Sequence, residues 1–175
     1  DSALERPNVL LITLDTTRAD HLATYGYFRE TTPHLDALAR ESVVFEQFLV
    51  PMATTLPTHM SIFTGLWPLE HGVLANIKHG GFVVEPSDEI HSAAEVFRDA
   101  GYRTAGFISA APLKEGTGIE HGFKNYDQPA APSRIAFRTI DKARGWLRRW
   151  SSHQARPFFL WVHLFDPHAP LTPPP

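Results

Sequence analysis

The sequence predicts an α/β fold in which a mostly parallel sheet lies between helices. Two observations lead to this prediction. Residues 8–14 and 157–165 are near-continuous runs of aliphatic and aromatic residues, a pattern typical of parallel strands that are covered on both faces. Between these runs, segments with a helical pattern alternate with shorter extended segments, as in sheets built from parallel strands and crossover helices.

The remaining elements follow from local signals along the chain. A short helix is expected over residues 32–39, because Pro33 suits the first helical turn, and residues 43–50 form a second extended run. Ser87 is expected to cap a helix that ends at Gly101. We expect a third strand over 103–109, an irregular Gly-rich segment over 116–127 and a long amphipathic helix over 133–150.

The composition is that of an enzyme domain and narrows the function little. The chain has 175 residues, of which 43% are hydrophobic, so it can bury a sizeable core. A formal net charge of -3 provides no basic face for nucleic acid, and no apolar run is long enough to span a bilayer. The absence of cysteine excludes a disulfide framework and leaves the compartment open, with an extracytoplasmic location favoured over a cytoplasmic one.

Thr55 is the candidate nucleophile. It stands two residues before Pro57 at the expected start of a helix, where the missing N–H of proline costs no helical hydrogen bond. The unpaired N–H groups and the positive end of the helix dipole at this position favour an alkoxide and an anionic substrate. The alternative is that Thr55 only caps the helix.

Asp15 is a candidate metal ligand because it directly follows the strand at 8–14. In open α/β sheets, ligands and metals bind at the carboxyl ends of the strands. Thr16 and Asp20 are weaker candidates of the same kind. An Asp after a strand also commonly caps a helix or forms a turn, and this alternative stays open for Asp15.

The last strand, at 157–165, brings Asp166 and His168 to the same edge of the sheet. A turn built by Asp-Pro and the following prolines explains Asp166 equally well. For His168 we favour a role in the site.

Three further histidines differ in their expected roles. His59 lies one helical turn after Thr55, so it can face the same pocket and orient the nucleophile or a bound oxyanion. His71 is expected to order the loop that leads to Asn76. His163, inside the last strand, is interpreted as a buried imidazole with satisfied hydrogen bonds rather than as a ligand.

Several short motifs follow one another in an order that is found in a known family. Asp15 after the first strand is followed by Thr-Leu-Pro at 55–57, Thr-Gly-Leu-Trp-Pro at 64–68, His-Gly-Val at 71–73 and then Asn76. This order resembles the N-terminal half of the alkaline phosphatase superfamily, specifically its sulfatase-like and nucleotide pyrophosphatase/phosphodiesterase branches. The resemblance implies the fold of that superfamily, with residues 1–175 as the N-terminal part of a single sulfatase-like domain.

The two branches imply different chemistry at Thr55. In sulfatases the matching position is a Cys or Ser that maturation converts to formylglycine, followed by a Pro and then an Arg. Threonine cannot give that aldehyde, and this chain has His59 in place of the Arg. In the phosphodiesterase branch the nucleophile is a Thr, and an Asn after a His-Gly pair contacts the phosphoryl oxygen. Thr55 and Asn76 fit the second pattern.

The resemblance also implies a metal site and a substrate contact. Sulfatase-like proteins carry a similar Asp-Pro-His-x-Pro segment, whose His, here His168, faces the charged oxygens of the substrate. In the phosphatase and phosphodiesterase branches an Asp at the end of this strand binds a second zinc. The implied metal ligands are Asp15, Thr55 and Asp166. One or two Zn²⁺ ions are the first choice because of the Thr nucleophile, and Ca²⁺ is the alternative.

Family members continue for roughly as much chain again, and that continuation supplies further metal ligands. Asp15 and Thr55 alone cannot hold a divalent ion tightly, since zinc takes about four ligands and calcium about six or more. We therefore expect that a missing C-terminal half completes the site.

The expected function is hydrolysis of phosphate mono- or diesters, or of related oxyanion esters, through a covalent Thr55 intermediate. The substrate is expected to be a small-molecule ester. A metal held partly by Asp15 would activate the hydroxyl, and Asn76, His59 and His168 would bind substrate. The alternatives are a sulfate-ester hydrolase, a phosphoryl-group transferase and, outside enzymes, a non-catalytic domain that binds an anion or glycan.

Overall fold

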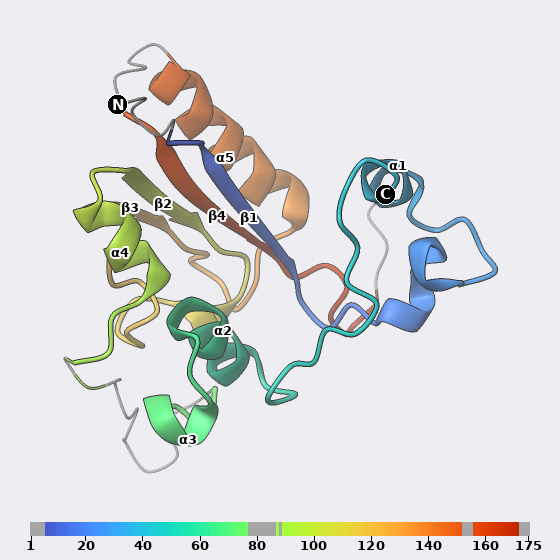
Figure 1. Ribbon diagram of the computed structural model, residues 1–175, viewed down its shortest axis with the longest axis horizontal. Coiled ribbons are helices and arrows are strands. Elements are labelled where there is room, and N and C mark those ends of the chain that lie inside the picture. Colours follow the sequence, from blue (N-terminus) through green and yellow to red (C-terminus); the bar gives the residue numbers. More distant parts are fainter. Residues whose placement is uncertain (1–5, 77–86, 88, 152–155, 172–175) are drawn as a thin grey trace, which may run out of the picture. The chain divides into compact units, whose positions relative to one another are not determined.

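The computed structural model describes residues 6–76, 87, 89–151 and 156–171 (Figure 1). The chain separates into two compact units. The larger unit is Asp1–Asp15 with Pro51–Pro175, and the smaller unit is Thr16–Val50. Each unit is described by itself.

The larger unit is built on a four-stranded parallel sheet. Its strands lie in the order β1 (Val9–Leu14), β4 (Phe158–Leu164), β2 (Arg103–Phe107) and β3 (Asn125–Asp127), and each neighbouring pair is parallel. The first and last strands of the chain are therefore neighbours, as Figure 1 shows. The α/β fold with a parallel sheet that the sequence predicts is confirmed.

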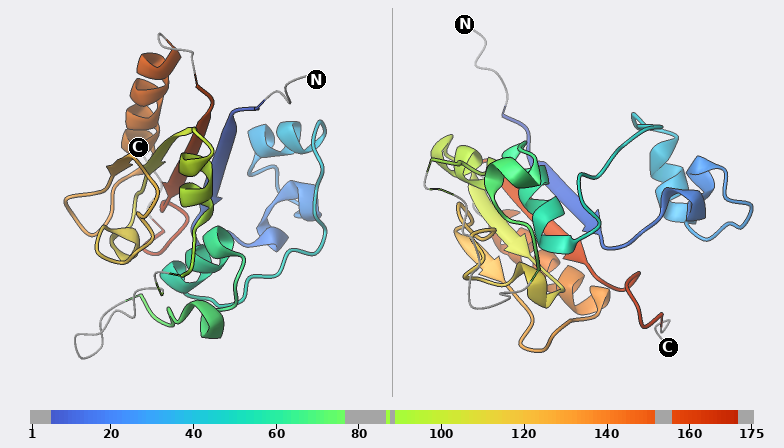
Figure 2. Two further views of the ribbon diagram at one scale, coloured as in Figure 1. Left: turned by 60° about the vertical axis from the view of Figure 1, so that its left-hand side comes forward. Right: turned by 90° about the horizontal axis from the view of Figure 1, so that it is seen from below.

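Helices pack on both faces of this sheet (Figure 2). On one face, α2 (Thr55–Thr64) and α4 (Ala93–Asp99) bury their apolar side chains against Phe159 and Trp161 of β4. On the other face, α5 (Ala136–Ser151) packs against Leu160 and Val162. Because successive side chains of a strand point to opposite faces, His163 lies on the same face as Trp161, the face of α2.

Parallel pairing brings the carboxyl ends of β1 and β4 together. Thr13 pairs with His163 and Leu14 with Leu164. The backbone N–H of Asp15 continues this ladder by donating to the carbonyl of Leu164 at 2.9 Å. Asp15 and the segment after β4 thus leave the sheet at the same edge, as predicted.

The prediction that the first strand is covered on both faces is wrong for the described residues. Leu10 and Ile12 are each 52% exposed. They pair with Leu160 and Val162 and so share the face of α5. That helix packs on the neighbouring strands β4 and β2, and β1, at the edge of the described sheet, keeps half of its outer apolar surface open.

One helix start and two segments differ from the sequence prediction, besides shifts of up to three residues at the ends of β2 and α5. The helix expected from Ser87 begins only at Ala93, because Ser92 and Glu95 form a reciprocal capping box, with hydrogen bonds of 2.9 and 3.2 Å. Part of the segment expected to be irregular forms β3, which pairs with β2. Residues 43–50 form no strand; all of them are exposed, and no described strand pairs with them.

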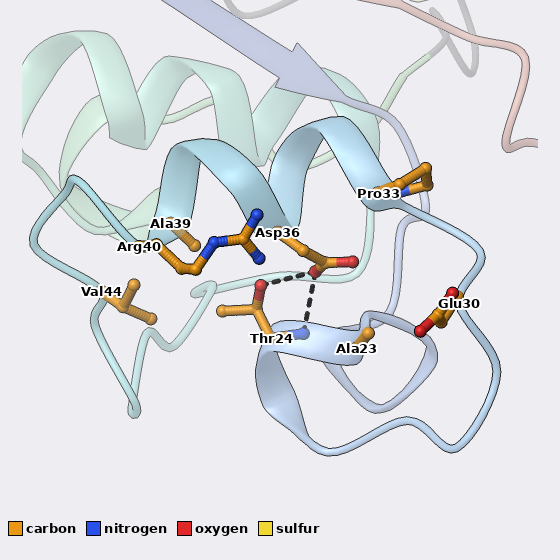
Figure 3. Close-up of a pocket in the computed structure, with 8 residues that line it drawn as sticks. All are labelled: Ala23, Thr24, Glu30, Pro33, Asp36, Ala39, Arg40 and Val44. Carbon is orange, nitrogen blue, oxygen red and sulfur yellow. Dashed lines mark hydrogen bonds between the residues drawn. The ribbon is translucent and has the colours of Figure 1, made fainter.

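The smaller unit contains α1 (Pro33–Ala39), which confirms the short helix predicted there, and two single turns, Ala19–His21 and Ala23–Tyr25. Thr24 donates both its backbone N–H and its hydroxyl to Asp36 Oδ1, at 3.0 and 2.6 Å, and so ties a turn to the helix (Figure 3). A pocket of about 600 Å³ lies beside this contact. Its one carboxylate on α1 is already bonded, so this pocket is a weak candidate site.

Two short elements of the larger unit complete the fold. α3 (Pro68–His71) follows α2, and a single turn, Ala111–Leu113, follows β2. Across the parts of the chain that the structure describes, no helix combines the length and the apolar composition needed to cross a membrane.

Candidate functional site

The candidate site lies at the amino end of α2, next to the carboxyl end of β1. Thr55 is the first residue of α2 and Pro57 lies in its first turn, as predicted. Thr54 occupies the N-cap position, in extended conformation and with no side-chain capping bond. The Thr55 hydroxyl is therefore not used as a helix cap and is available for another contact.

That contact is with Asp15. Thr55 Oγ1 donates to Asp15 Oδ2 at 3.2 Å. The same carboxylate oxygen accepts a second hydrogen bond, from His163 Nε2, also at 3.2 Å. Asp15 is 7% exposed and His163 is fully buried. The hydroxyl is thus fixed by a buried carboxylate that a buried imidazole holds from the other side.

The charge of Asp15 is stabilised in this position. Burial raises the pKa of its carboxyl, but the hydrogen bond and charge of His163 and the bond from Thr55 outweigh burial and hold the pKa below its ordinary value. Asp15 is consequently an ionised acceptor at neutral pH.

His59 lies beneath Thr55 and ties it to the sheet. Its Nδ1–H donates to the carbonyl of Thr55 at 2.7 Å, so its Nε2 is the acceptor for the Thr13 hydroxyl at 3.2 Å. Thr13 Oγ1 in turn accepts the indole N–H of Trp161 at 3.1 Å. The three hydrogen bonds thus form a chain in which each group donates to the next. It runs from Trp161 on β4 to Thr13 on β1, then to His59 and to the backbone carbonyl of Thr55.

The imidazole of His59 is neutral in this chain of hydrogen bonds. Burial, followed by the charge of His163, whose ring lies edge-on with a centroid separation of 5.0 Å, lowers the pKa of His59 to about 4. Both ring nitrogens bond protein atoms. The geometry therefore makes His59 a positioning residue for Thr55, and the substrate contact expected of it stays a prediction.

Asn76 reaches the first turn of α2, as its position in the motif suggests. Its Oδ1 accepts the backbone N–H of Leu56 at 2.7 Å. The loop before it is held by His71, whose Nδ1 accepts from Val73 N at 3.1 Å and whose Nε2 contacts Ser61 Oγ at 3.0 Å. This agrees with the prediction that His71 orders the loop. Within the described chain the amide nitrogen of Asn76 has no partner, so it is available to an anion.

The segment after β4 is arranged differently from the expected ligand set. Asp166 Oδ2 accepts the backbone N–H of Ala136 at 2.7 Å and so caps the start of α5. His168 stacks on Phe165, with ring centroids 4.3 Å apart, and donates its Nδ1–H to the carbonyl of Ala169 at 2.7 Å. No described contact joins either side chain to Asp15 or Thr55.

The described residues provide only some of the ligands that a metal site needs. Within the described residues no group of three or more His, Asp or Glu side chains could hold an ion. Asp15 fits a ligand because it is buried, ionised and directed at Thr55. Asp20, a weaker candidate, is ion-paired with Arg18 at 2.6 Å in the smaller unit.

The sequence missed the role of His163. The prediction that its imidazole is buried is correct, but the ring bonds Asp15 and its Nδ1 is buried without a hydrogen-bond partner in the described chain. The pairing of Thr13 with His163 decides this contact. A single sequence does not contain the register between two strands that lie at opposite ends of the chain.

This chain is similar to one family model and to several known proteins. A family model described as Sulfatase matches residues 7–175. Arylsulfatase A of Bos taurus is 35% identical over 133 residues, which cover 71% of this chain and 25% of that protein. Bis(5'-adenosyl)-triphosphatase ENPP4 of Bos taurus is 40% identical over 76 residues, or 43% of this chain and 16% of that protein.

A solved structure shows the same fold. The phosphonate monoester hydrolase of Agrobacterium radiobacter superposes with a TM-score of 0.74 at 23% identity, covering 97% of this chain and 42% of that one. The chain thus spans less than half the length of each of these three proteins.

Proposed function

The chain belongs to the sulfatase family, and we propose that it carries the nucleophile of a hydrolase that cleaves phosphate mono- or diesters. The observation that carries this proposal is the hydrogen bond from Thr55 Oγ1 to Asp15 Oδ2 at the amino end of α2. A hydroxyl bonded to an ionised carboxylate at a helix start is arranged for attack on an anionic ester.

The proposed reaction has two steps. Thr55 Oγ bonds to phosphorus while the bond from phosphorus to the leaving ester oxygen breaks. The hydroxyl proton passes toward Asp15 Oδ2, and the departing oxygen takes up a proton from solvent. Water then attacks phosphorus and displaces the Thr55 oxygen, which takes back the proton held by Asp15, while the attacking water gives a proton to solvent. The product is phosphate from a monoester or a phosphate monoester from a diester.

Two groups are suited to the charge that develops on the transferred phosphoryl oxygens. The backbone N–H of Thr55 and the amide nitrogen of Asn76 both lie at the start of α2, where the helix dipole favours an anion. We propose that His168 contacts the same oxygens through its Nε2, since its Nδ1 is engaged with Ala169.

A divalent ion completes this proposal, with Asp15 and Thr55 as the residues that would hold it. Such an ion, when bound, lowers the pKa of a coordinated hydroxyl and neutralises charge on the phosphoryl group. Zn²⁺ is proposed first and Ca²⁺ second. We propose that the remaining ligands come from sequence outside this chain, and that Asp166 joins them only if it leaves Ala136.

Sulfate esters are the second candidate substrates. The similarity to arylsulfatase A extends over 71% of the chain and favours them. The Thr at position 55 and the similarity to a triphosphatase and a phosphonate hydrolase favour phosphorus. Thr55 differs from the formylglycine precursors in sulfatases, so phosphate esters are placed first.

The test compares Thr55→Val with Thr54→Val in the longest form of the protein that contains this chain. Hydrolysis of aryl phosphate, phosphodiester and sulfate esters is measured, together with metal content by elemental analysis. Acid-quenched reactions are digested and examined by mass spectrometry. We expect one phosphoryl group on the peptide that carries Thr55, and turnover that Thr55→Val abolishes and Thr54→Val preserves.

Full turnover by Thr55→Val would exclude Thr55 as the nucleophile. A folded protein that binds the esters but turns none of them over would instead favour a non-catalytic binding domain. Covalent modification by sulfate rather than phosphate esters would move the substrate class to sulfates.

A further inference from the structure

A basic pocket lies at the end of the sheet opposite to Thr55. It has a volume of about 640 Å³ and is formed where β2, β3 and β4 begin, beside the last turn of α5. Five of the sixteen Lys and Arg residues of the chain line it. These are Arg98, Arg103, Lys124, Arg149 and Arg156.

The positive charge of this pocket is balanced only in part by acidic residues that the structure describes. None of its described lining residues is acidic. Arg98 is paired with Asp99 at 2.8 Å and with Glu95 at 3.9 Å. Arg103, Lys124 and Arg156 make no ion pair with any residue that the structure describes. The whole chain carries a net charge of -3, so this concentration of positive charge is local rather than general.

The walls of the pocket are aromatic and held in place. Trp150 donates its indole N–H to the carbonyl of Arg156 at 3.0 Å and packs edge-on against Phe158, with ring centroids 4.9 Å apart. Trp146 also packs on Phe158, and Tyr102 packs on Phe97. The cations therefore lie among aromatic side chains whose positions are fixed by packing.

We propose that this pocket binds a compact polyanion, a molecule with several sulfate or phosphate groups on a small ring framework. Guanidinium groups bind such oxyanions through paired N–H donors, and aromatic walls cover the ring. A bounded pocket of this volume suits a small ligand rather than an extended polymer. The proposal is independent of the function proposed for Thr55.

Two probes carry several oxyanion groups on a small ring framework and differ in the kind of oxyanion. Sucrose octasulfate carries sulfates, and inositol hexakisphosphate carries phosphates. Binding of each to the full protein is measured by isothermal titration calorimetry. Sucrose and myo-inositol serve as uncharged controls. We expect binding of at least one polyanion and of neither control; the preferred probe identifies the oxyanion.

A matched pair of double variants locates the binding. Arg103→Ala with Arg149→Ala removes two cations from the pocket. Arg144→Ala with Arg148→Ala removes two exposed cations of α5 that do not line it. Because each charge-assisted contact is worth about tenfold in affinity, we expect the first double variant to weaken binding by at least about tenfold. The second should change it little.

Equal weakening by both double variants would overturn the proposal, because it would show general charge attraction. Absence of polyanion binding to the wild-type protein would overturn it as well. Thermal unfolding confirms that each variant is folded, and Arg103→Gln with Arg149→Gln replaces the alanine pair if that pair unfolds. Thr55→Val should bind the polyanion as the wild type does.

Discussion

His163 Nε2 lies 3.2 Å from Asp15 Oδ2, although 148 residues separate the two in sequence. The contact joins the residue that follows β1, the first strand along the chain, to β4, the last strand along the chain, which pairs with β1. Through it, the position of Thr55 depends on a side chain that touches neither Thr55 nor, under our proposal, the substrate.

Replacing His163 with Phe should impair the candidate site without altering its nucleophile. Asp15 would stay buried and lose a hydrogen bond, which destabilises the fold by about 1–3 kcal/mol. Loss of such a supporting contact typically costs about 10- to 100-fold in activity. Urea unfolding and kcat/KM for an aryl phosphate check both effects, with His91→Phe, an exposed position, as the control. Unchanged kcat/KM in folded His163→Phe would show that Asp15 needs no support.

Thr13→Val should break the chain of hydrogen bonds that connects Trp161 to His59 and Thr55. Valine has nearly the same shape but leaves the indole N–H of Trp161 and the Nε2 of His59 without their partner. We expect a loss of about 1–3 kcal/mol in the free energy of unfolding. Thr13→Ser keeps the hydroxyl and should retain most of that stability. If the two variants melt alike, the hydroxyl contributes nothing.

The stability of the protein should fall as the pH drops below 6.5, partly through His71. Burial lowers the pKa of His71 from its ordinary value of 6.5. A group with a lower pKa in the folded state binds fewer protons there than in the unfolded chain. Its contribution is therefore complete above pH 6.5 and is lost as the pH falls toward the folded-state pKa.

The geometry gives the same sign, since a protonated His71 Nδ1 cannot accept the N–H of Val73. We expect the urea midpoint of the wild type to fall more than that of His71→Gln between about pH 7.5 and about pH 5.5. Burial also lowers the pKa of His59, which stays in both proteins, so the difference isolates His71. Parallel pH profiles would assign the decline to other groups.

Asp166 can be tested as a cap and as a metal ligand separately. Asp166→Ala removes the acceptor for Ala136 N and should cost about 1 kcal/mol in stability. Asp166→Ser keeps a capping oxygen without the charge, so it should recover most of this loss. Asp141→Ala, on the exposed side of α5, controls for removal of a carboxylate. If Asp166→Ser restores stability but loses bound metal, Asp166 is also a ligand.

Much of the fold could be predicted because its signals are local. The bounds of the apolar runs at 8–14 and 157–165 each lie within one residue of the bounds of β1 and β4. The start of α2 followed from Thr55 and Pro57. The start of α4 was misplaced because Ser87 and Ser92 give the same capping signal, and only Ser92 has Glu95 in position to complete the box.

The contacts of the site could be predicted only in part. They depend on the register between strands and on contacts with elements that are distant in the sequence. The rule for parallel sheets placed Asp15 at the correct edge, Pro57 placed Thr55 at the start of a helix, and the structure joins the two side chains. Asp166 reached the same edge but is engaged by α5, which the pattern of its own strand does not reveal. Metal identity, substrate class and compartment stay predictions.

The bonds around Thr55 also limit when the site can form during synthesis. Thr13 and Asp15 are made early, but their partners Trp161 and His163 lie 148 residues later in each case. Chains are synthesised from the amino end, and such distant pairings form late. Until β4 has left the ribosome and inserted beside β1, the Asp15 carboxylate has no imidazole partner. A nascent chain that stops before β4 would therefore carry the nucleophile on a helix without the contacts that orient it.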